Sequence, residues 1–495
     1  MKIVAFLLFL TNSLIDGRCL LDSKDIFEYK LRQENFLTNE AVDNNAQPMP
    51  IYYDGIPIAP EFDDDVRHKY EDEFTINNRA GVATKLFDGD IVLRPNEAAR
   101  IKQAAKGAQA FADAKTVQYT NWITNDTLRW PVDTKARNEY GNLVGPMINY
   151  TLDWHKIVIP ASVKWMNNIL NAHKNIEKYT CVRFRNSSEG DHLHYYWGYG
   201  CNSQVGRTGG KQWISLGPGC WTVNGVHETL HALGSNHEQS RLDRDAFIKI
   251  HQENMIQNIA DAFAIIPGSP TGNPYDFGSV MHYNSKAFAK TDKLETIETI
   301  NKNYQQTMGW RLGLSFLDAK AINHRYCEHV CDDYPWHSPD CRNNGYANPN
   351  KCTECLCPDG YAAPYCDSVE IGHVNGETEV CPGESNILLT PQNPTFTEFR
   401  WYNATNFTCY WRLRAPASHY IEVKLFRLDG FTCEQSCYNF VEIKHGNLAN
   451  SGPRFCCGLP TESMFTEVKG HEVIIIASAV QKGNYSVGLT YSITE

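Results

Sequence analysis

Residues 227–237 have the sequence HETLHALGSNH, and this stretch decides how the rest of the chain is interpreted. On a helix, residues four apart share one face, so His227 and His231 point the same way. Gly234 can adopt a positive φ, which ends the helix and lets His237 turn back as a third nitrogen ligand. Three neutral imidazoles leave one position on Zn²⁺ for water, which is typical of a catalytic site. Glu228 follows the first ligand, and we expect it to reach that water without binding the metal.

Other interpretations of this stretch fit less well. A lone H-E-x-x-H also occurs by chance in helices, but the longer pattern includes the helix-ending Gly234 and a third histidine. A thermolysin-like protease would use a distant glutamate and would need neither Gly234 nor His237. A decayed, non-catalytic copy would have lost Glu228 or a histidine, and none is lost. The sequence therefore predicts a catalytic zinc site.

The amino terminus and the cysteines predict a secreted protein. Lys2, an apolar run over residues 3–10 and small or polar residues up to Gly17 are typical of a cleaved signal peptide of residues 1–17, too short to span a membrane. Of 17 cysteines, Cys19 lies at that boundary, and the remaining 16 are compatible with eight disulfides. No later segment is long enough to span a membrane, and the net charge of −11 argues against a nucleic-acid partner. Sequons that permit glycosylation lie at Asn125, Asn149, Asn186, Asn403, Asn406 and Asn484.

Upstream of the zinc motif the pattern is mixed. Residues 18–85 are polar and irregular, so we expect a loosely ordered segment. Residues 96–115 are rich in Ala, Lys and Gln and predict a helix. Residues 155–175 predict an amphipathic core helix with Val163, Met166, Ile169 and Leu170 at helical spacing. Strands are predicted at 182–184, 193–197 and 213–216.

The composition changes after Cys327. Residues 328–370 hold six cysteines and few large aliphatic side chains, so disulfides must stabilise a segment that cannot build a core. Residues 381–495 alternate apolar and polar residues in short runs, which predicts an all-β sandwich. Examples are Ile421, Val423 and Leu425, and the apolar run 473–477 is predicted to be a buried strand.

The zinc motif is followed by SVMHY at residues 279–283, and the two together resemble the astacin family of metzincin zinc endopeptidases. The resemblance implies an α+β catalytic domain with a twisted sheet and a zinc-binding active-site helix. It makes Met281 an apolar floor beneath the metal and Tyr283 a displaceable fifth ligand that later donates to the oxyanion. By the same resemblance Glu238 pairs with the amino terminus formed on activation.

A further match lies at residues 87–91, FDGDI, which resemble the pro-segment motif F-x-G-D-I of that family. The resemblance places Asp90 on the zinc ion in the zymogen. An ordinary surface turn is the alternative, because Asp-Gly pairs are common in turns.

The chain departs from the family pattern near the expected mature start. The family motif I-P-Y usually follows W-P closely, whereas here Trp130-Pro131 is followed at a distance by Ile148-Asn149-Tyr150. The proline is replaced and a sequon is created, so we expect an altered edge strand. We place the activation cleavage within 112–129 and favour the bond after Lys115.

The carboxyl-terminal part resembles the EGF-like and CUB modules of nematode-type astacins. Pairing among Cys433, Cys437, Cys456 and Cys457 stays open, and a zinc knuckle at 352–357 is disfavoured because secreted thiols oxidise. Asn439 and Glu442 stand near the CUB calcium region, but the key acid is absent, which makes calcium binding doubtful. The disulfides implied by the resemblance are Cys181–Cys327, Cys201–Cys220, Cys331–Cys352, Cys341–Cys355, Cys357–Cys366 and Cys381–Cys409.

These observations predict a secreted zinc metalloendopeptidase made as a zymogen, with Glu228 as general base and acid. Its expected partners are extracellular protein substrates and an activating protease. The alternative is a secreted binding protein that keeps a non-catalytic protease fold and works through its EGF-like and CUB surfaces. The expected divisions are a signal peptide (1–17), a propeptide (18–115), a catalytic domain (116–327), an EGF-like domain (328–370) and a CUB domain (381–495).

Overall fold

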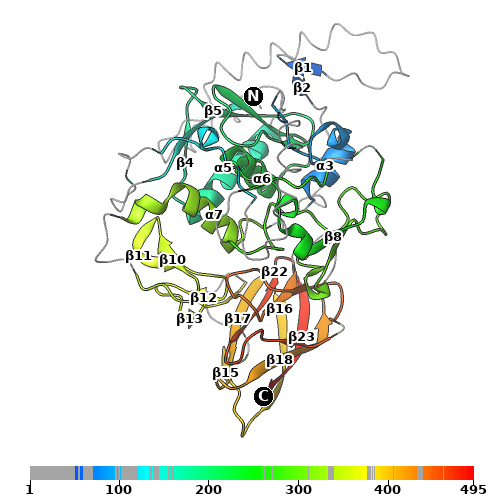
Figure 1. Ribbon diagram of the computed structural model, residues 1–495, viewed down its shortest axis with the longest axis vertical. Coiled ribbons are helices and arrows are strands. Elements are labelled where there is room, and N and C mark those ends of the chain that lie inside the picture. The colour runs from blue at the N-terminus through cyan, green and yellow to red at the C-terminus, as the bar shows by residue number, and fades with distance from the viewer. Residues whose placement is uncertain are drawn as a thin grey trace, which may run out of the picture. The chain divides into compact units, whose positions relative to one another are not determined.

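The computed structural model describes most of the chain beyond residue 70, and Figure 1 traces its elements. The expected signal peptide lies outside the described residues, as does nearly all of the helix expected at 96–115. Tyr53–Glu495 form one compact unit. Apart from single residues and short breaks, the described ranges are 51–53, 56–58, 71–94, 121–132, 144–153, 161–257, 262–268, 273–309, 312–332, 339–375 and 385–495.

The segment ahead of the zinc motif contains more structure than its composition suggests. Two short strands, β1 (Ile51–Tyr53) and β2 (Ile56–Ile58), precede helix α3 (Glu73–Arg79). The Asp72 carboxylate accepts a hydrogen bond from the Thr75 amide at 2.6 Å and caps the start of α3. The expectation of a loosely ordered segment is therefore wrong for residues 71–85, where Phe74 and Ile76 are buried.

A five-stranded sheet forms the first layer of the structure around the zinc motif. Its strands are β3 (Met147–Asp153), β4 (Arg183–Asn186), β5 (His192–Tyr196), β6 (Cys201–Asn202) and β7 (Lys211–Leu216), in the order β4-β3-β5-β7-β6. The first four strands in that order are parallel, and the edge strand β6 is antiparallel to β7. The strand that contains Asn149 was expected at an edge, but β3 pairs on both sides and lies inside the sheet.

Three longer helices accompany this sheet: α5 (Ala161–Tyr179), α6 (Thr222–Leu233) and α7 (Phe316–Tyr326). Helix α5 buries Trp165 and Ile169, and the Trp165 indole donates to the Leu216 carbonyl of β7 at 2.7 Å. Val163, assigned to the core from its spacing, is 44% exposed. It lies off the buried stripe of residues 165, 166, 169, 172, 173 and 176.

Helix α6 ends where the sequence requires it to end. Gly234 has a φ of 111°, and its amide donates to the His231 carbonyl at 2.8 Å. A side chain at this position would place its Cβ 3.0 Å from Ile123 Cδ1, so both the backbone and the packing favour glycine. The chain then turns toward the sheet edge, and β8 (Ile248–Ile250) pairs further on with β9 (Ile297–Thr299).

Seven disulfides are resolved among the described residues. Cys181–Cys327 joins the start of β4 to the end of α7, and Cys201–Cys220 joins β6 to the start of α6. A small region rich in cysteine follows, with strands β10 (Tyr346–Asn348), β11 (Lys351–Leu356), β12 (Tyr361–Ala362) and β13 (Ser368–Val369). Its disulfides are Cys331–Cys352, Cys341–Cys355 and Cys357–Cys366.

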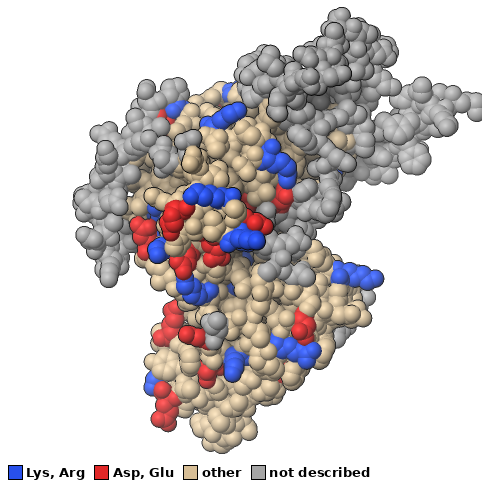
Figure 2. Space-filling view, turned by 90° about the vertical axis from the view of Figure 1, so that its right-hand side faces the viewer, with Lys and Arg blue, Asp and Glu red and all other residues tan. Residues whose placement is uncertain are grey.

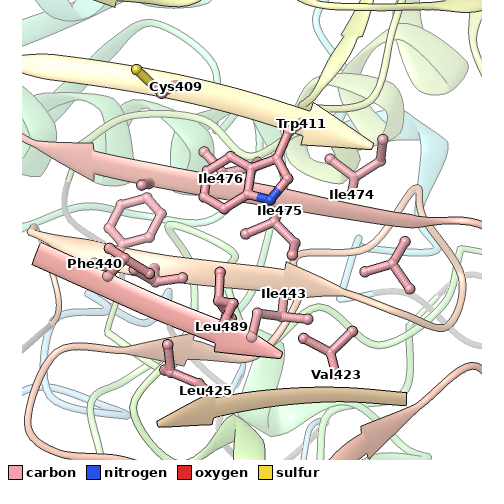
Figure 3. Close-up of a cluster of buried hydrophobic side chains, with 14 of the residues drawn as sticks. Cys409, Trp411, Val423, Leu425, Phe440, Ile443, Ile474, Ile475, Ile476 and Leu489 are labelled. Atoms are coloured by element: carbon pink, nitrogen blue, oxygen red, sulfur yellow. The ribbon is translucent and has the colours of Figure 1, made fainter. Parts of the chain in front are cut away.

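The carboxyl-terminal part is all β. One sheet contains β14 (His373–Val374), β15 (Asn386–Leu388), β17 (Phe407–Arg414), β19 (Phe440–Lys444), β20 (Arg454–Phe455) and β22 (Val473–Ala479). The other contains β16 (Thr395–Ala404), β18 (Tyr420–Asp429), β21 (Met464–Phe465) and β23 (Gly483–Thr494). The predicted alternation on β18 is confirmed, since Ile421, Val423 and Leu425 are buried. Figure 3 shows Val423 and Leu425 within the cluster of buried side chains. The disulfides here are Cys381–Cys409 and Cys437–Cys456, and Cys457 is also disulfide-bonded.

Charged side chains of both signs lie on the face of the molecule shown in Figure 2. Figure 2 shows one face, on which acidic and basic side chains are intermixed and neither sign forms a continuous patch. Within the described part of the chain, no helix is long and apolar enough to cross a membrane.

Candidate metal centre

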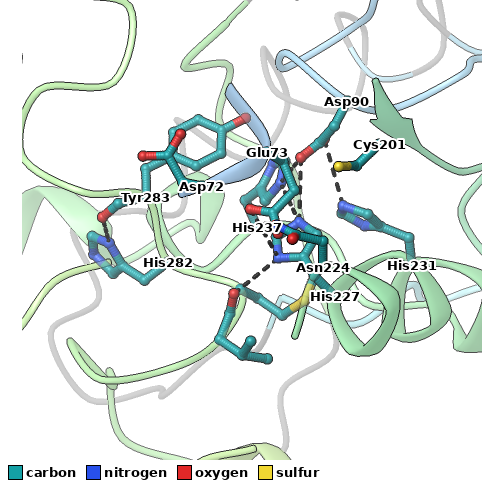
Figure 4. A network of polar contacts seen from close by, with 12 residues as sticks. Asp72, Glu73, Asp90, Cys201, Asn224, His227, His231, His237, His282 and Tyr283 are labelled. Carbon is teal, nitrogen blue, oxygen red and sulfur yellow. Dashed lines mark hydrogen bonds and ion pairs between the residues drawn. The ribbon is translucent and has the colours of Figure 1, made fainter. Parts of the chain in front are cut away.

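Three histidines and one aspartate converge at the carboxyl-terminal end of α6 (Figure 4). His227 and His231 come from successive turns of α6, and His237 follows the turn at Gly234. Asp90 Oδ2 lies 3.2 Å from His227 Nε2 and 3.1 Å from His237 Nε2, and Asp90 Oδ1 lies 3.5 Å from His231 Nε2. The four ligand atoms all lie within 4.8 Å of one another, and all four side chains are buried.

The other ring nitrogen of each histidine is held by an acceptor. His227 Nδ1 lies 2.9 Å from the Val280 carbonyl, and His231 Nδ1 lies 2.7 Å from the Ser235 carbonyl. His237 Nδ1 lies 2.7 Å from Asp88 Oδ2. These contacts place the proton on Nδ1 of each ring and leave Nε2 to bind a metal ion.

The residues present fit a zinc ion. Three imidazole nitrogens and one carboxylate oxygen make a four-donor set of the kind that Zn²⁺ prefers. His231 Nε2 and Asp90 Oδ1 are buried and have no hydrogen-bond partner among the described residues, a costly arrangement that a shared metal ion would relieve.

Burial and charge act in opposite directions on these groups. Burial alone would raise the pKa of Asp90, but His237, His227 and His231 lower it well below its usual value. Burial lowers the pKa of His231 to about 4, whereas at His237 the carboxylates of Asp90 and Asp88 outweigh burial and raise the pKa to about 10. Asp90 is therefore an ionised oxygen donor and His231 a neutral nitrogen donor, which are the forms that bind a metal ion, whereas His237 is protonated in the metal-free protein and must lose the proton of Nε2 to bind one.

Asp90 is held in place by a tight turn docked on the edge strand. Phe87 and Ile91 exchange two backbone hydrogen bonds, and the Val92 amide donates to the Ser203 carbonyl at 2.8 Å. Asn77, from α3, donates to the carbonyls of Gly89 and Cys201 and accepts from the Cys201 amide. The segment therefore covers the site and the sheet edge beside β6.

Residues 279–283, the Met-turn, contact His227 and the residue that follows His237. The Glu238 amide donates to the Met281 carbonyl at 2.9 Å, and Met281 is fully buried. The Tyr283 hydroxyl donates a short hydrogen bond to the Asp88 carbonyl. The turn is anchored from α7 by Asp318, which accepts from the Ser279 hydroxyl and the Val280 amide.

Two glutamates of the motif are also buried. Glu228 lies on α6 directly after His227 and is fully buried. Glu238 accepts from Arg241 at 2.8 Å and from the Asp276 amide at 2.9 Å. Burial raises the pKa of Glu238 to about 7, against the opposing effect of Arg241.

The sequence analysis missed several residues that contact the histidines or their neighbours. Asp88 contacts His237, and Glu73 Oε2 lies 3.8 Å from His227 Nδ1. Asp88 lies two residues before Asp90 in the motif at 87–91. A second carboxylate so close to Asp90 was the one sign in the sequence that Asp88 could also reach the site. Asn77, Glu73 and Asp318 carried no such signal, because only the fold brings them to the site.

Glu442, named in the sequence analysis beside the calcium region of CUB modules, has partners within the protein. Glu442 accepts from Arg454 at 2.8 Å and from the Gly452 amide at 2.6 Å, so its carboxylate is engaged within the sandwich.

The sequons differ in exposure. The Asn149 side chain donates to the Glu189 carbonyl at 2.7 Å and accepts from Arg185. The other sequon asparagines are exposed: Asn125, Asn186, Asn403, Asn406 and Asn484.

Comparison with known proteins shows which family this chain is similar to. Residues 148–327 match the model of a peptidase family described as Astacin. Zinc metalloproteinase nas-37 of Caenorhabditis elegans is 40% identical over 322 residues, which are 63% of this chain and 39% of that protein. Zinc metalloproteinase nas-36 of Brugia malayi is 32% identical over 413 residues, which are 79% of this chain and 67% of that protein.

Among solved structures, High choriolytic enzyme 1, a hatching enzyme zinc-protease from Oryzias latipes (medaka fish), is 30% identical. The match has a TM-score of 0.36 and covers 41% of this chain and 96% of that chain. The chain spans less than two thirds of the first curated relatives, namely 39% of nas-37 and 65% of nas-36 from Caenorhabditis briggsae.

Proposed function

This chain belongs to the astacin family of peptidases, and we propose on that basis that it is a secreted zinc metalloendopeptidase made as a latent precursor. Its substrates would be extracellular proteins. The observation that carries the proposal is the buried set of three histidine nitrogens and one upstream carboxylate within 4.8 Å of one another. The disulfides support an oxidising, extracellular location.

His227, His231 and His237 would hold the zinc ion, which when bound polarises the scissile carbonyl and lowers the pKa of water. Glu228 is the proposed general base. It follows the first ligand on the same helix and would take the proton of the attacking water and pass it to the leaving nitrogen.

Tyr283 is the proposed donor to the carbonyl oxygen as it gains negative charge. Its hydroxyl already donates to a peptide carbonyl, that of Asp88. In the latent protein, burial, reinforced by the carboxylates of Asp88 and Asp90, raises the pKa of Tyr283 well above its usual value, so the phenol is protonated when the pro-segment leaves. Removal of the pro-segment would release this hydroxyl for a substrate carbonyl.

Latency follows from the position of Asp90. The carboxylate lies among the three histidine nitrogens, and the residues around it are buried, so a substrate has no access until residues 71–94 leave. We further propose that activation cleaves the chain between Lys115 and Asn121, within the expected range 112–129. The Asn121 carbonyl accepts from the Asn236 amide, and a cavity of about 20 Å³ lies between Asn121 and Glu238. A new amino terminus close to this cavity would have Glu238 as its partner.

The domain divisions and glycosylation sites complete the proposal. We assign residues 116–327 to the catalytic domain, 328–370 to an EGF-like domain and 381–495 to a CUB domain. The three disulfides of the second, the first two of which cross along the sequence, and the two sheets of the third support these divisions. The exposed sequons are the proposed glycosylation sites, and the engaged side chain of Asn149 argues against that position.

The test compares the activated protein with Glu228→Ala and with the isosteric Glu228→Gln. We expect both variants to keep one zinc per chain and to lose about 10²–10⁴-fold in turnover of a test protein, the usual contribution of a general base. A chelator should abolish cleavage by the wild type. The alternative of a binding protein would be favoured if the activated wild type bound zinc yet left every unfolded polypeptide intact.

A further inference from the structure

The pro-segment contributes a second carboxylate to the metal centre besides Asp90. Asp88 is only 1% exposed, and its Oδ2 accepts from the Ser240 hydroxyl at 2.8 Å. The same oxygen lies 2.7 Å from Nδ1 of His237, the side of the ring that faces away from the metal position. Asp90 therefore contacts the inner nitrogen of His237 while Asp88 contacts the outer one.

The three histidines differ in which part of the chain supplies the hydrogen-bond acceptor of the outer ring nitrogen, Nδ1. His227 is held by the Val280 carbonyl and His231 by the Ser235 carbonyl, and both acceptors remain when the pro-segment is lost. His237 is held by Asp88, which would leave with the pro-segment. Activation therefore removes the outer hydrogen-bond partner of one ligand and spares those of the other two.

The backbone fixes Asp88 in this position. Its φ of 47° lies in the left-handed region, which aspartate and asparagine tolerate better than most residues. The Tyr283 hydroxyl binds its carbonyl, and the paired residues Phe87 and Ile91 close the turn around it. The carboxylate is thus presented to His237 by a rigid element.

We propose, resting on the proposed zinc site, that Asp88 is a positioning residue that strengthens zinc binding in the latent protein. A carboxylate on the outer nitrogen of a zinc-bound imidazole fixes the tautomer and makes the ligand more basic. The pro-segment then does two things at once: Asp90 blocks the site, and Asp88 tightens the hold of His237 on the metal. The latent chain binds zinc more tightly than the processed enzyme, which has lost both carboxylates.

The experiment measures zinc affinity of the intact, unprocessed chain by competition with a chromophoric chelator. Asp88→Asn keeps a hydrogen-bond acceptor and suits the left-handed backbone but removes the charge, whereas Asp88→Gly removes both. Loss of an outer partner typically weakens metal binding about 10–100-fold. We expect a loss of about tenfold or more for Asp88→Gly and a smaller loss for Asp88→Asn.

Asp72→Ala is the matched control, because Asp72 is a buried pro-segment carboxylate that caps α3 and contacts Asn284 rather than a ligand histidine. It should loosen the pro-segment while leaving zinc affinity within about twofold, given that no outer partner is removed. Wild-type affinity in Asp88→Gly would overturn the inference, and so would equal losses in Asp88→Gly and Asp72→Ala. If the wild-type chain bound no zinc at all, the proposed function would fail first.

Discussion

The turn that carries Asp90 depends on the absence of a side chain at Gly89, and Gly89→Ala tests how well that turn fits. Gly89 has a φ of 81°, and an added Cβ would lie 2.8 Å from Phe288 Cζ and 3.3 Å from the Tyr283 hydroxyl. The Phe288 ring cannot move aside easily, since it packs against Phe74 with ring centroids 4.1 Å apart. The substitution should therefore weaken docking of the pro-segment.

The magnitude follows from two contributions. A left-handed backbone costs a residue with a Cβ roughly 1–2 kcal/mol, and overpacking costs typically about 1–3 kcal/mol. A gain of about 0.4–1 kcal/mol from the stiffer undocked chain offsets part of this. The net loss of about 1–4.6 kcal/mol corresponds to a rise of about fivefold to about two thousandfold in the open, active fraction, because 1.4 kcal/mol is tenfold.

The assay is the initial rate of peptide hydrolysis by the unprocessed chain, divided by the rate after complete activation. Gly81→Ala is a matched control, because Gly81 has a φ of 70° in the same segment but nothing within 4 Å of the added Cβ. Activated enzymes from both variants should equal the wild type, since neither glycine remains. If unprocessed Gly89→Ala were no more active than unprocessed Gly81→Ala, the contact with Phe288 would not be the reason that glycine is required at position 89.

Two further predictions concern the Met-turn. Tyr283→Phe should lower kcat of the activated enzyme by about 10²–10³-fold with little change in KM, the usual cost of removing a donor to an oxyanion; an unchanged kcat in steady-state assays would remove Tyr283 from the mechanism. Burial raises the pKa of Asp318 from 3.8 to about 6, so its protonated form favours the folded state. This contribution to stability is fully present below pH 3.8 and is lost as the pH rises through about 6. In Asp318→Asn the melting temperature should therefore vary less with pH between these values than in the wild type. An equal pH dependence of the melting temperature in the two proteins would contradict a role for Asp318 in it.

The parts of the fold that could be predicted from the sequence are those in which spacing alone dictates geometry. The positions of His227 and His231 follow from the helical repeat, and the end of α6 follows from Gly234. The alternation of Ile421, Val423 and Leu425 likewise gives one buried face of a strand. In each case a local pattern has one favourable arrangement.

The missed features depend on contacts between distant residues. Helix α3 has few apolar residues, and it is ordered through polar side chains whose partners lie elsewhere, as when Asn224 donates to Glu73 at 2.8 Å. Val163 fits a helical repeat but falls outside the buried stripe of α5. The pairing of Cys437 with Cys456 stayed open because spacing does not decide connectivity.

The carboxylates of the pro-segment connect latency to metal binding. A buried carboxylate is costly unless it is compensated, and Asp88 and Asp90 are both compensated through His237. By thermodynamic linkage, any factor by which the docked segment strengthens zinc binding is also the factor by which zinc strengthens docking. A tenfold gain in affinity would thus add about 1.4 kcal/mol to the stability of the latent form. The same contacts that shut the site would then retain the metal that the site needs after activation.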